Sequence, residues 1–138
     1  GLEVRLYHAY FIKANDVVYD NEGNIVEVLC TYDPITLSGT GFNERKPNGT
    51  IGFVEATTAQ QAIFNSFESL LLNDDPDIHF LDRINNDSWH TSKGFVEKGE
   101  YKPLDHFQFI RDGYYVVDLD TKEDQLIFNR TVSLKGSK

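Results

Sequence analysis

The stretch that decides the fold is HFQFIRDGYYVVD, residues 106–118. Phe107 and Phe109 share one face of an extended chain, and aromatic and β-branched residues resume directly after Gly113. Such residues are typical of a half-buried strand, and a glycine inside the run indicates a bend or a bulge. The stretch therefore predicts one buried strand that bends near Gly113.

Two polar side chains of this stretch, Gln108 and Arg111, are candidates for nucleic-acid recognition. An amide that donates and accepts, together with a planar fork of guanidinium donors, suits the reading of unpaired base edges. On a regular strand their odd spacing would send the two side chains to opposite faces, so joint recognition requires the bend. The alternative is that both are ordinary surface residues.

Composition favours a β-rich protein without a metal centre. The chain has 138 residues, enough for one domain or two small β-modules, and its 10 Phe and 7 Tyr far outnumber the single Trp. We expect Trp89 in the core, with stacking on a base as the alternative, and we expect no disulfide from the lone Cys30 and no zinc site from four scattered histidines. No apolar run approaches the roughly 20 residues of a membrane span, and no signal-peptide pattern is present. We therefore expect a soluble, cytoplasmic protein.

The charge distribution argues against a protein that coats nucleic acid by bulk attraction. The net charge is −9, from 13 basic and 22 acidic residues. Residues 55–87 carry seven acids against Arg83 alone, whereas residues 1–13, 43–46 and 93–111 each have one more base than acids. Any basic footprint is therefore local, on a largely acidic protein.

Turn residues and alternation predict further strands. Val17–Tyr19 and Ile25–Tyr32 flank a polar turn that contains Gly23, which predicts a hairpin. The loop over 36–48 carries Arg45 and Lys46, which either grip a phosphate or are solvated loop charges.

The second half of the chain is less decisive. The segment 57–72 fits helical spacing and strand alternation about equally well. A short helix is expected over 77–84, a strand over 88–97, and a last strand over 125–134. The acidic run 73–77 lacks the spacing of a calcium loop.

We expect no catalytic residues and no metal ligands in this chain. It has no paired carboxylates in a catalytic pattern, no Ser-His-Asp or Cys-His arrangement, and no glycine-rich nucleotide loop.

Nine short motifs, taken in chain order, resemble the C-terminal anticodon-binding region of glutaminyl-tRNA synthetase. They are EVRL (3–6), AY (9–10), IK (12–13), CTYDP (30–34), RK (45–46), GTI (49–51), GFVE (94–97), FQFxRxGYY (107–115) and FNRTVxL (128–134). Each motif alone is weak, but the ordered set covers nearly the whole chain. Glutamyl-tRNA synthetases of eukaryotic type share the same barrel module and are the alternative.

The resemblance implies an all-β fold of two small β-barrel modules, the first complete or incomplete, with one or two short helices. By this likeness the distal barrel spans residues 14–97, and residues 1–13 and 98–138 contribute to the proximal barrel. It also implies that 63–71 is a strand. The parent enzyme would join glutamine to tRNA-Gln with ATP and magnesium in a separate catalytic domain. This chain would bind the anticodon loop, would bind no DNA and would need no cofactor.

Matched to the family position by position, Gln108 and Arg111 would read the central anticodon base. Arg5 would contact the anticodon region, and Arg45 and Lys46 belong to a matched basic pair. Arg130 also lies in a matched motif, where we expect a structural role.

The sequence departs from the family at several places, one of which is Gly52-Phe53-Val54 where the family has HWV, and three of which remove charged side chains. Tyr7 stands where the family has a second arginine, Ile110 stands where it has an acid that would orient Arg111, and the segment 63–71 has no arginine. With the net charge, these departures support a second hypothesis, a β-scaffold interaction domain that has lost RNA binding.

Overall fold

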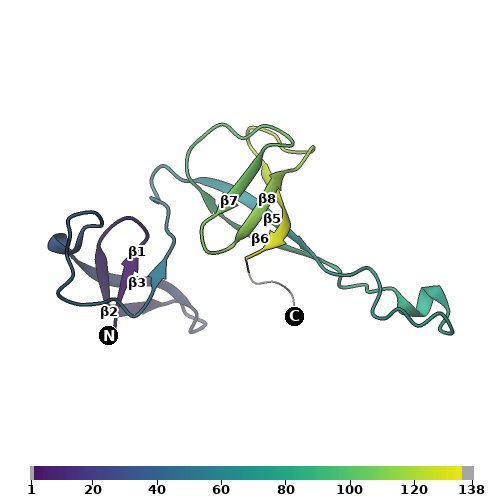
Figure 1. The fold of residues 1–138 in the computed structure, drawn as a ribbon, viewed down its shortest axis with the longest axis horizontal. Helices are drawn as coiled ribbons and strands as arrows, with labels where there is room; N and C mark the ends of the chain where they lie inside the picture. Colours follow the sequence, from purple (N-terminus) through teal and green to yellow (C-terminus); the bar gives the residue numbers. More distant parts are fainter. Residues whose placement is uncertain (1, 135–138) are drawn as a thin grey trace. The chain divides into compact units, whose positions relative to one another are not determined.

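A computed structural model describes residues 2–134, which form two compact units divided between Phe53 and Val54 (Figure 1). Each unit is built on one β-sheet, so the all-β prediction of two small modules is confirmed. The described residues have no α-helix, only two short 3-10 helices, Pro34–Thr36 (η1) and Phe80–Arg83 (η2).

The first unit contains a four-stranded sheet in the order β3-β2-β1-β4. Its strands are Glu3–Leu6 (β1), Phe11–Tyr19 (β2), Ile25–Asp33 (β3) and Thr50–Ile51 (β4). β2 and β3 form the predicted antiparallel hairpin, in which the Asp20 carboxylate accepts hydrogen bonds from the Glu22 and Asn24 backbones across the turn. β4 pairs with β1 in parallel, which brings the loop that carries Arg45 back to the sheet.

The buried centre of the first unit is small. Phe11 is 1% exposed, and within residues 2–53 it is the only large hydrophobic side chain that is fully buried. Its backbone N–H donates to the hydroxyl of Thr36 at 2.7 Å, and that hydroxyl donates in turn to the carbonyl of Asp33 at 2.7 Å. The 3-10 helix is thereby attached to the sheet.

The second unit contains a five-stranded sheet in the order β6-β5-β9-β8-β7. Its strands are Gln60–Phe67 (β5), Trp89–Val96 (β6), His106–Phe109 (β7), Gly113–Val117 (β8) and Leu126–Ser133 (β9). β5 and β9 pair in parallel, and the other neighbours are antiparallel. The predicted strands over 88–97 and 125–134 are confirmed.

An aromatic core fills one face of this sheet. Phe128 is fully buried, and its ring contacts four others: Phe64, Tyr101, Phe107 and Phe109, with centroids 5.2–6.2 Å away. The expectation that Trp89 lies in a core is wrong. Trp89 is 65% exposed at the start of β6, where its ring stacks on Phe67.

The prediction of a single bent strand over 106–118 is also wrong. The segment is a hairpin, because β7 ends at Phe109 and β8 begins at Gly113, with Ile110–Asp112 as the connection. The backbone N–H of Asp112 donates to the carbonyl of Phe109 at 3.0 Å, which closes the turn. Sequence periodicity could not separate a kink from a reversal, since both keep strand residues on either side.

The ambiguous segment 57–72 is a strand in its centre. β5 covers Gln60–Phe67, so strand is confirmed over helix, although the expected range of 63–71 lies too far along the chain. Of the described residues 68–72 that follow β5 in this segment, only Leu71 forms a β-bridge, and its partner is Ile84. The expected short helix over 77–84 is the four-residue η2, in a connection that extends away from the sheet (Figure 1).

The pairings given for the described residues run from β3 to β4 and from β6 to β7 without closing a ring. Closure into barrels therefore stays a prediction. The observed units also divide the chain after Phe53, whereas the resemblance divides it into 14–97 against 1–13 with 98–138. The assignment of residues to barrels stays a prediction as well. Over residues 2–134 no helix is both long and apolar enough to cross a membrane.

Candidate nucleic-acid interface

The β7–β8 hairpin presents Gln108 to solvent. Gln108 is exposed on β7, between the half-buried rings of Phe107 and Phe109, because alternate residues of a strand face opposite sides. Its direct partner across the hairpin is Tyr114 of β8. Within the part of the chain that the structure describes, no hydrogen bond is recorded for the Gln108 amide, which leaves its donors and acceptor available to a ligand.

Arg111 lies at the tip of the same hairpin. It is exposed, and its backbone has φ of +66°, in the left-handed region. A residue with a Cβ atom in that region is strained by about 1–2 kcal/mol. Strain of this kind concentrates at functional sites, where the surrounding structure enforces it. Because Arg111 lies in the turn and not on a strand, the alternation of strand side chains does not force it to the face opposite Gln108.

Three residues around Arg111 hold the turn in place. The hydroxyl of Tyr115 donates to the carboxylate of Asp112 at 2.7 Å. Gly113 packs so closely on β9 that an added Cβ would lie 2.8 Å from the carbonyl oxygen of Val132 and 3.3 Å from Cδ of Arg130. Burial of the phenol, and then its bond to Asp112, raise the pKa of Tyr115 to about 12.

A β-bulge places Arg130 beside this turn. The register shifts between Tyr114 and Tyr115, which pair with Val132 and Arg130, so Thr131 is the extra residue. Bulges commonly re-aim a side chain. A cavity of about 260 Å³ next to the hairpin is lined by Phe64, Asn65, Ser66, Ser92, Asp112, Tyr115 and Arg130.

Sequence reasoning missed the link between Asp112 and Tyr115. No spacing rule indicates it, because the bond depends on a reversal that the periodicity did not reveal. It also missed a polar chain across the sheet, in which the buried Asn65 accepts from the indole of Trp89 and donates to Asn129. The side chain of Arg130, for which we expect a structural role, fills the space that a Cβ atom at position 113 would need.

Arg5, in the first unit, is occupied by contacts within the chain. Its guanidinium donates to the carbonyls of Ala9 and Thr36, both at 3.2 Å, and to the hydroxyl of Ser38 at 2.5 Å. It also lies over the ring of Phe11, 4.4 Å from the centroid. Half-buried in this way, Arg5 fastens the loop after β3 to the sheet.

Arg45 is held between two carboxylates. It donates to Glu3 at 2.7 and 3.0 Å and to Asp33 at 2.6 Å. These hydrogen bonds lower the pKa values of Glu3 and Asp33 and raise that of Arg45. The guanidinium also approaches the rings of Phe11 and Phe42. Arg45 therefore anchors the loop over 36–48, and the positive charge of Arg45 is balanced by the two carboxylates.

Lys46, next in the chain, is exposed, and its amine forms no ion pair with another residue of the described part of the chain, 2–134. The five predicted residues thus form two groups. Gln108 and Arg111 belong to one hairpin of the second unit. In the first unit, the guanidinium groups of Arg5 and Arg45 both approach the ring of Phe11, and Lys46 is next to Arg45 in the chain. Their roles toward RNA stay predictions.

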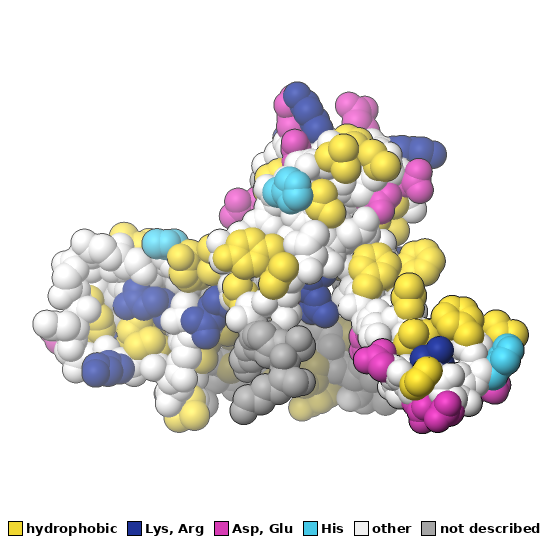
Figure 2. Space-filling view, turned by 45° about the vertical axis from the view of Figure 1, so that its right-hand side comes forward, with side chains coloured by type: hydrophobic (Ala, Val, Ile, Leu, Met, Phe, Trp, Pro, Cys, Tyr) yellow, Lys and Arg dark blue, Asp and Glu magenta, His cyan; other side chains and the backbone are white. Residues whose placement is uncertain are grey.

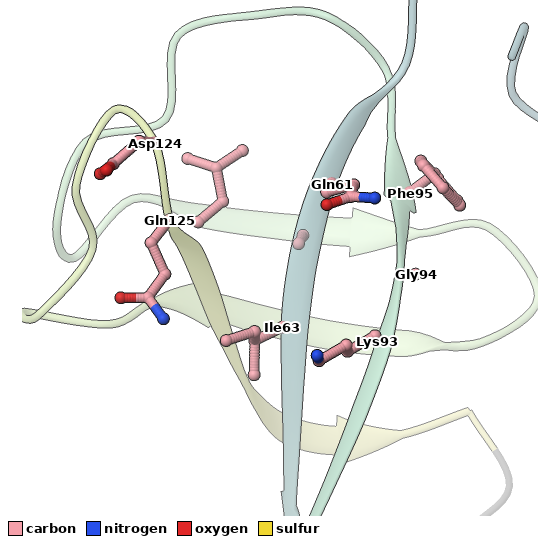
Figure 3. A pocket seen from close by; sticks show the side chains of 9 residues that line it. Gln61, Ile63, Lys93, Gly94, Phe95, Asp124 and Gln125 are labelled. Atoms are coloured by element: carbon pink, nitrogen blue, oxygen red, sulfur yellow. The ribbon is translucent and has the colours of Figure 1, made fainter.

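A shallow depression of about 360 Å³ lies on another part of the second unit (Figure 3). Gln61 and Ile63 of β5 face the same side as Phe95 and Lys93 of β6, to which they are paired, and Gln125 directly precedes β9. It contains none of the predicted site residues. Among residues 2–134, no three His, Cys, Asp or Glu side chains gather where they could hold a metal ion.

The connection between β5 and β6 has a different surface. Residues 68–88 carry six acidic side chains against one arginine, and Figure 2 shows acidic and apolar side chains together at the far end of the connection. The exposed apolar ones are Leu70, Leu72, Ile78, Phe80 and Leu81. An acidic segment repels phosphates, so the candidate RNA-contacting surface of this unit is the β7–β8 hairpin.

Comparison with known proteins gives a consistent family. The family model for the anti-codon binding domain of class I tRNA synthetases (E and Q) matches residues 50–118, half of the chain. The matched segment includes both β7 and β8.

Several curated relatives match almost the whole chain, and each of the three named below covers 99% of its length. A glutamine–tRNA ligase of Clostridium perfringens is 48% identical, one of Clostridioides difficile is 46% identical, and one of Rhodopirellula baltica is 42% identical. The chain spans 26%, 26% and 24% of these proteins. It therefore corresponds to about a quarter of each relative.

Proposed function

The chain belongs to the family of anticodon-binding domains of class I tRNA synthetases for glutamate and glutamine, and from this membership we propose that it recognises the anticodon loop of tRNA-Gln. The relatives that match over 99% of the chain are glutamine–tRNA ligases, which favours glutamine over glutamate as the cognate amino acid. The chain acts as a recognition module of such a ligase.

One observation carries the proposal. Gln108 and Arg111 are both exposed on one short hairpin, and neither has a recorded side-chain partner within residues 2–134. The amide can form two hydrogen bonds to one base, and the guanidinium can bind a base edge or a neighbouring phosphate. An unstacked anticodon base would meet both groups at the hairpin tip.

The first unit has a supporting role in this proposal. Arg5 and Arg45 are engaged by the protein itself, so they fix the loop over 36–48 rather than supply free charge. Lys46 is exposed at that loop and is the cation that would contact a phosphate. Its contribution would be electrostatic and sensitive to salt.

The ligation chemistry lies outside this chain. We propose that the parent protein joins glutamine to tRNA-Gln in a catalytic domain that uses ATP and magnesium, in the cytoplasm. The chain itself would hold neither cofactor and would contribute binding energy and base discrimination.

Titration of a labelled anticodon stem-loop of tRNA-Gln at low salt tests the proposal. The chain should bind it more tightly than a stem-loop with a changed central base. Gln108→Ala and Arg111→Ala should each weaken that discrimination, by roughly 1–3 kcal/mol for a lost bidentate contact. Lys46→Ala should weaken binding to both stem-loops equally.

The competing function is a β-scaffold that binds protein and has lost its RNA contacts. The net charge of −9 and the absence of arginine from 63–71 favour it. Equal binding of the cognate and changed stem-loops, unaffected by Gln108→Ala, would support this scaffold and overturn the recognition module.

A further inference from the structure

We propose that Tyr114 is the stacking platform for the base that Gln108 reads. This inference rests on the proposed function and adds to it a residue that the family resemblance did not assign. The amide would recognise the edge of the base, and the phenol ring would hold its face.

The register of the hairpin puts the two side chains together. Gln108 of β7 and Tyr114 of β8 are direct partners in the antiparallel ladder. Direct partners project from the same face of a sheet, with Cβ atoms about 4.5–5.5 Å apart. The turn that carries Arg111 follows immediately, so the ring, the amide and the guanidinium lie at one end of the hairpin.

The ring of Tyr114 is accessible. It is 45% exposed, and within residues 2–134 no ring contact is recorded for it. The next residue shows the contrast. Tyr115 is 5% exposed, and its ring packs on Phe109 and Phe64 at 5.0 and 5.8 Å. Alternation along β8 thus sends one tyrosine into the core and the other to the face of Gln108.

The neighbouring strand extends this apolar surface. Tyr114 pairs on its other side with Val132 of β9, which is 58% exposed. A row of Gln108, Tyr114 and Val132 therefore crosses three strands on the exposed face. Stacking on an aromatic face tolerates any base, whereas hydrogen bonds select among bases, so the two neighbours would divide affinity and discrimination between them.

A double-mutant cycle on the full 138-residue chain tests this. Tyr114→Val keeps a strand-forming residue and removes the ring, and it should weaken binding of the cognate stem-loop by about 5- to 150-fold. Tyr114→Phe should restore binding. On a stem-loop whose central nucleotide is abasic, Tyr114→Val should have little further effect, because the ring has lost its partner.

Two results would overturn the inference while the recognition function stands. In the first, the wild-type chain discriminates the central base, and Tyr114→Val binds the cognate stem-loop as tightly as wild type does. The other is an equal loss on the cognate and the abasic stem-loops. Failure of the proposed function looks different, because wild type itself would then bind the cognate stem-loop and the stem-loop with a changed central base equally. Tyr19→Ala removes a tyrosine that is 58% exposed in the first unit and serves as the matched control.

Discussion

The hydroxyl of Tyr115 donates a hydrogen bond of 2.7 Å to the carboxylate of Asp112. One partner is buried in the aromatic core, and the other directly follows Arg111 in the exposed turn. The bond therefore ties the tip of the candidate recognition hairpin to the buried core of the second unit. Because an arginine gains specificity only when its fork is held in place, the tie matters for recognition as well as for folding.

Removing this hydroxyl should destabilise the protein. Tyr115→Phe keeps the ring in the core and removes a hydrogen bond to a charged acceptor, so the free energy of unfolding should fall by roughly 1–3 kcal/mol. Urea denaturation measures it. Tyr114→Phe removes the hydroxyl of the exposed neighbour and should be nearly neutral. Equal effects of the two variants would contradict the assigned role.

Tyr115 should also make stability fall at alkaline pH. Its pKa rises from 10.0 to about 12 on folding, so the folded chain holds the phenolic proton more tightly than the unfolded chain does. The stabilisation is complete below pH 10 and is lost as the pH rises from 10 toward 12. The stability difference between wild type and Tyr115→Phe, measured at a series of pH values, should shrink over that range. A constant difference would disprove it.

Gly113 should not tolerate a side chain. In Gly113→Ala the new Cβ would meet the carbonyl oxygen of Val132 at 2.8 Å, and backbone atoms cannot move aside as a flexible side chain can. Overpacking of this kind costs roughly 1–3 kcal/mol of stability. Gly49→Ala is the matched control, since its Cβ would have no atom within 4 Å. Thermal melting of both variants decides the matter, and similar melting temperatures would refute the prediction.

Arg111→Gly should separate stability from recognition. Glycine adopts positive φ without strain, so the variant should be about 1 kcal/mol more stable than Arg111→Ala. Both variants lack the guanidinium and should lose discrimination of the central anticodon base equally. Denaturation and stem-loop titration measure the two properties. A loss of RNA binding that followed stability instead of the guanidinium would argue against direct contact.

Arg45→Ala should change the acid titration of the first unit. Hydrogen bonds from Arg45 lower the pKa values of Glu3 and Asp33, so the stability they provide is present above their ordinary values of 4.5 and 3.8 and is lost as the pH falls below them. In Arg45→Ala both pKa values should rise, as carboxylate NMR would show. Arg45→Lys keeps the charge without the planar fork and should give an intermediate result. Unchanged titrations would show that the ion pairs do not persist in solution.

Local pattern was enough to predict most of the fold. The hairpin of β2 and β3 follows from two alternating runs on either side of a polar turn, and β6 and β9 follow from strand-forming residues between turn residues. These signals act over a few residues, so the sequence alone determines them. The ordered motifs likewise indicated the family without any structure.

Only the tertiary structure decided which contacts each candidate side chain makes within the protein. It showed a hairpin in place of the predicted bend, with Gln108 on β7 and Arg111 in the turn, and it paired Arg45 with Glu3, which lies 42 positions away. It also set Tyr114 beside Gln108. Such partnerships depend on strand register and chain reversal, which bring together residues that local periodicity cannot relate. Most strands could therefore be predicted from the sequence, whereas the side-chain contacts around the candidate residues could not.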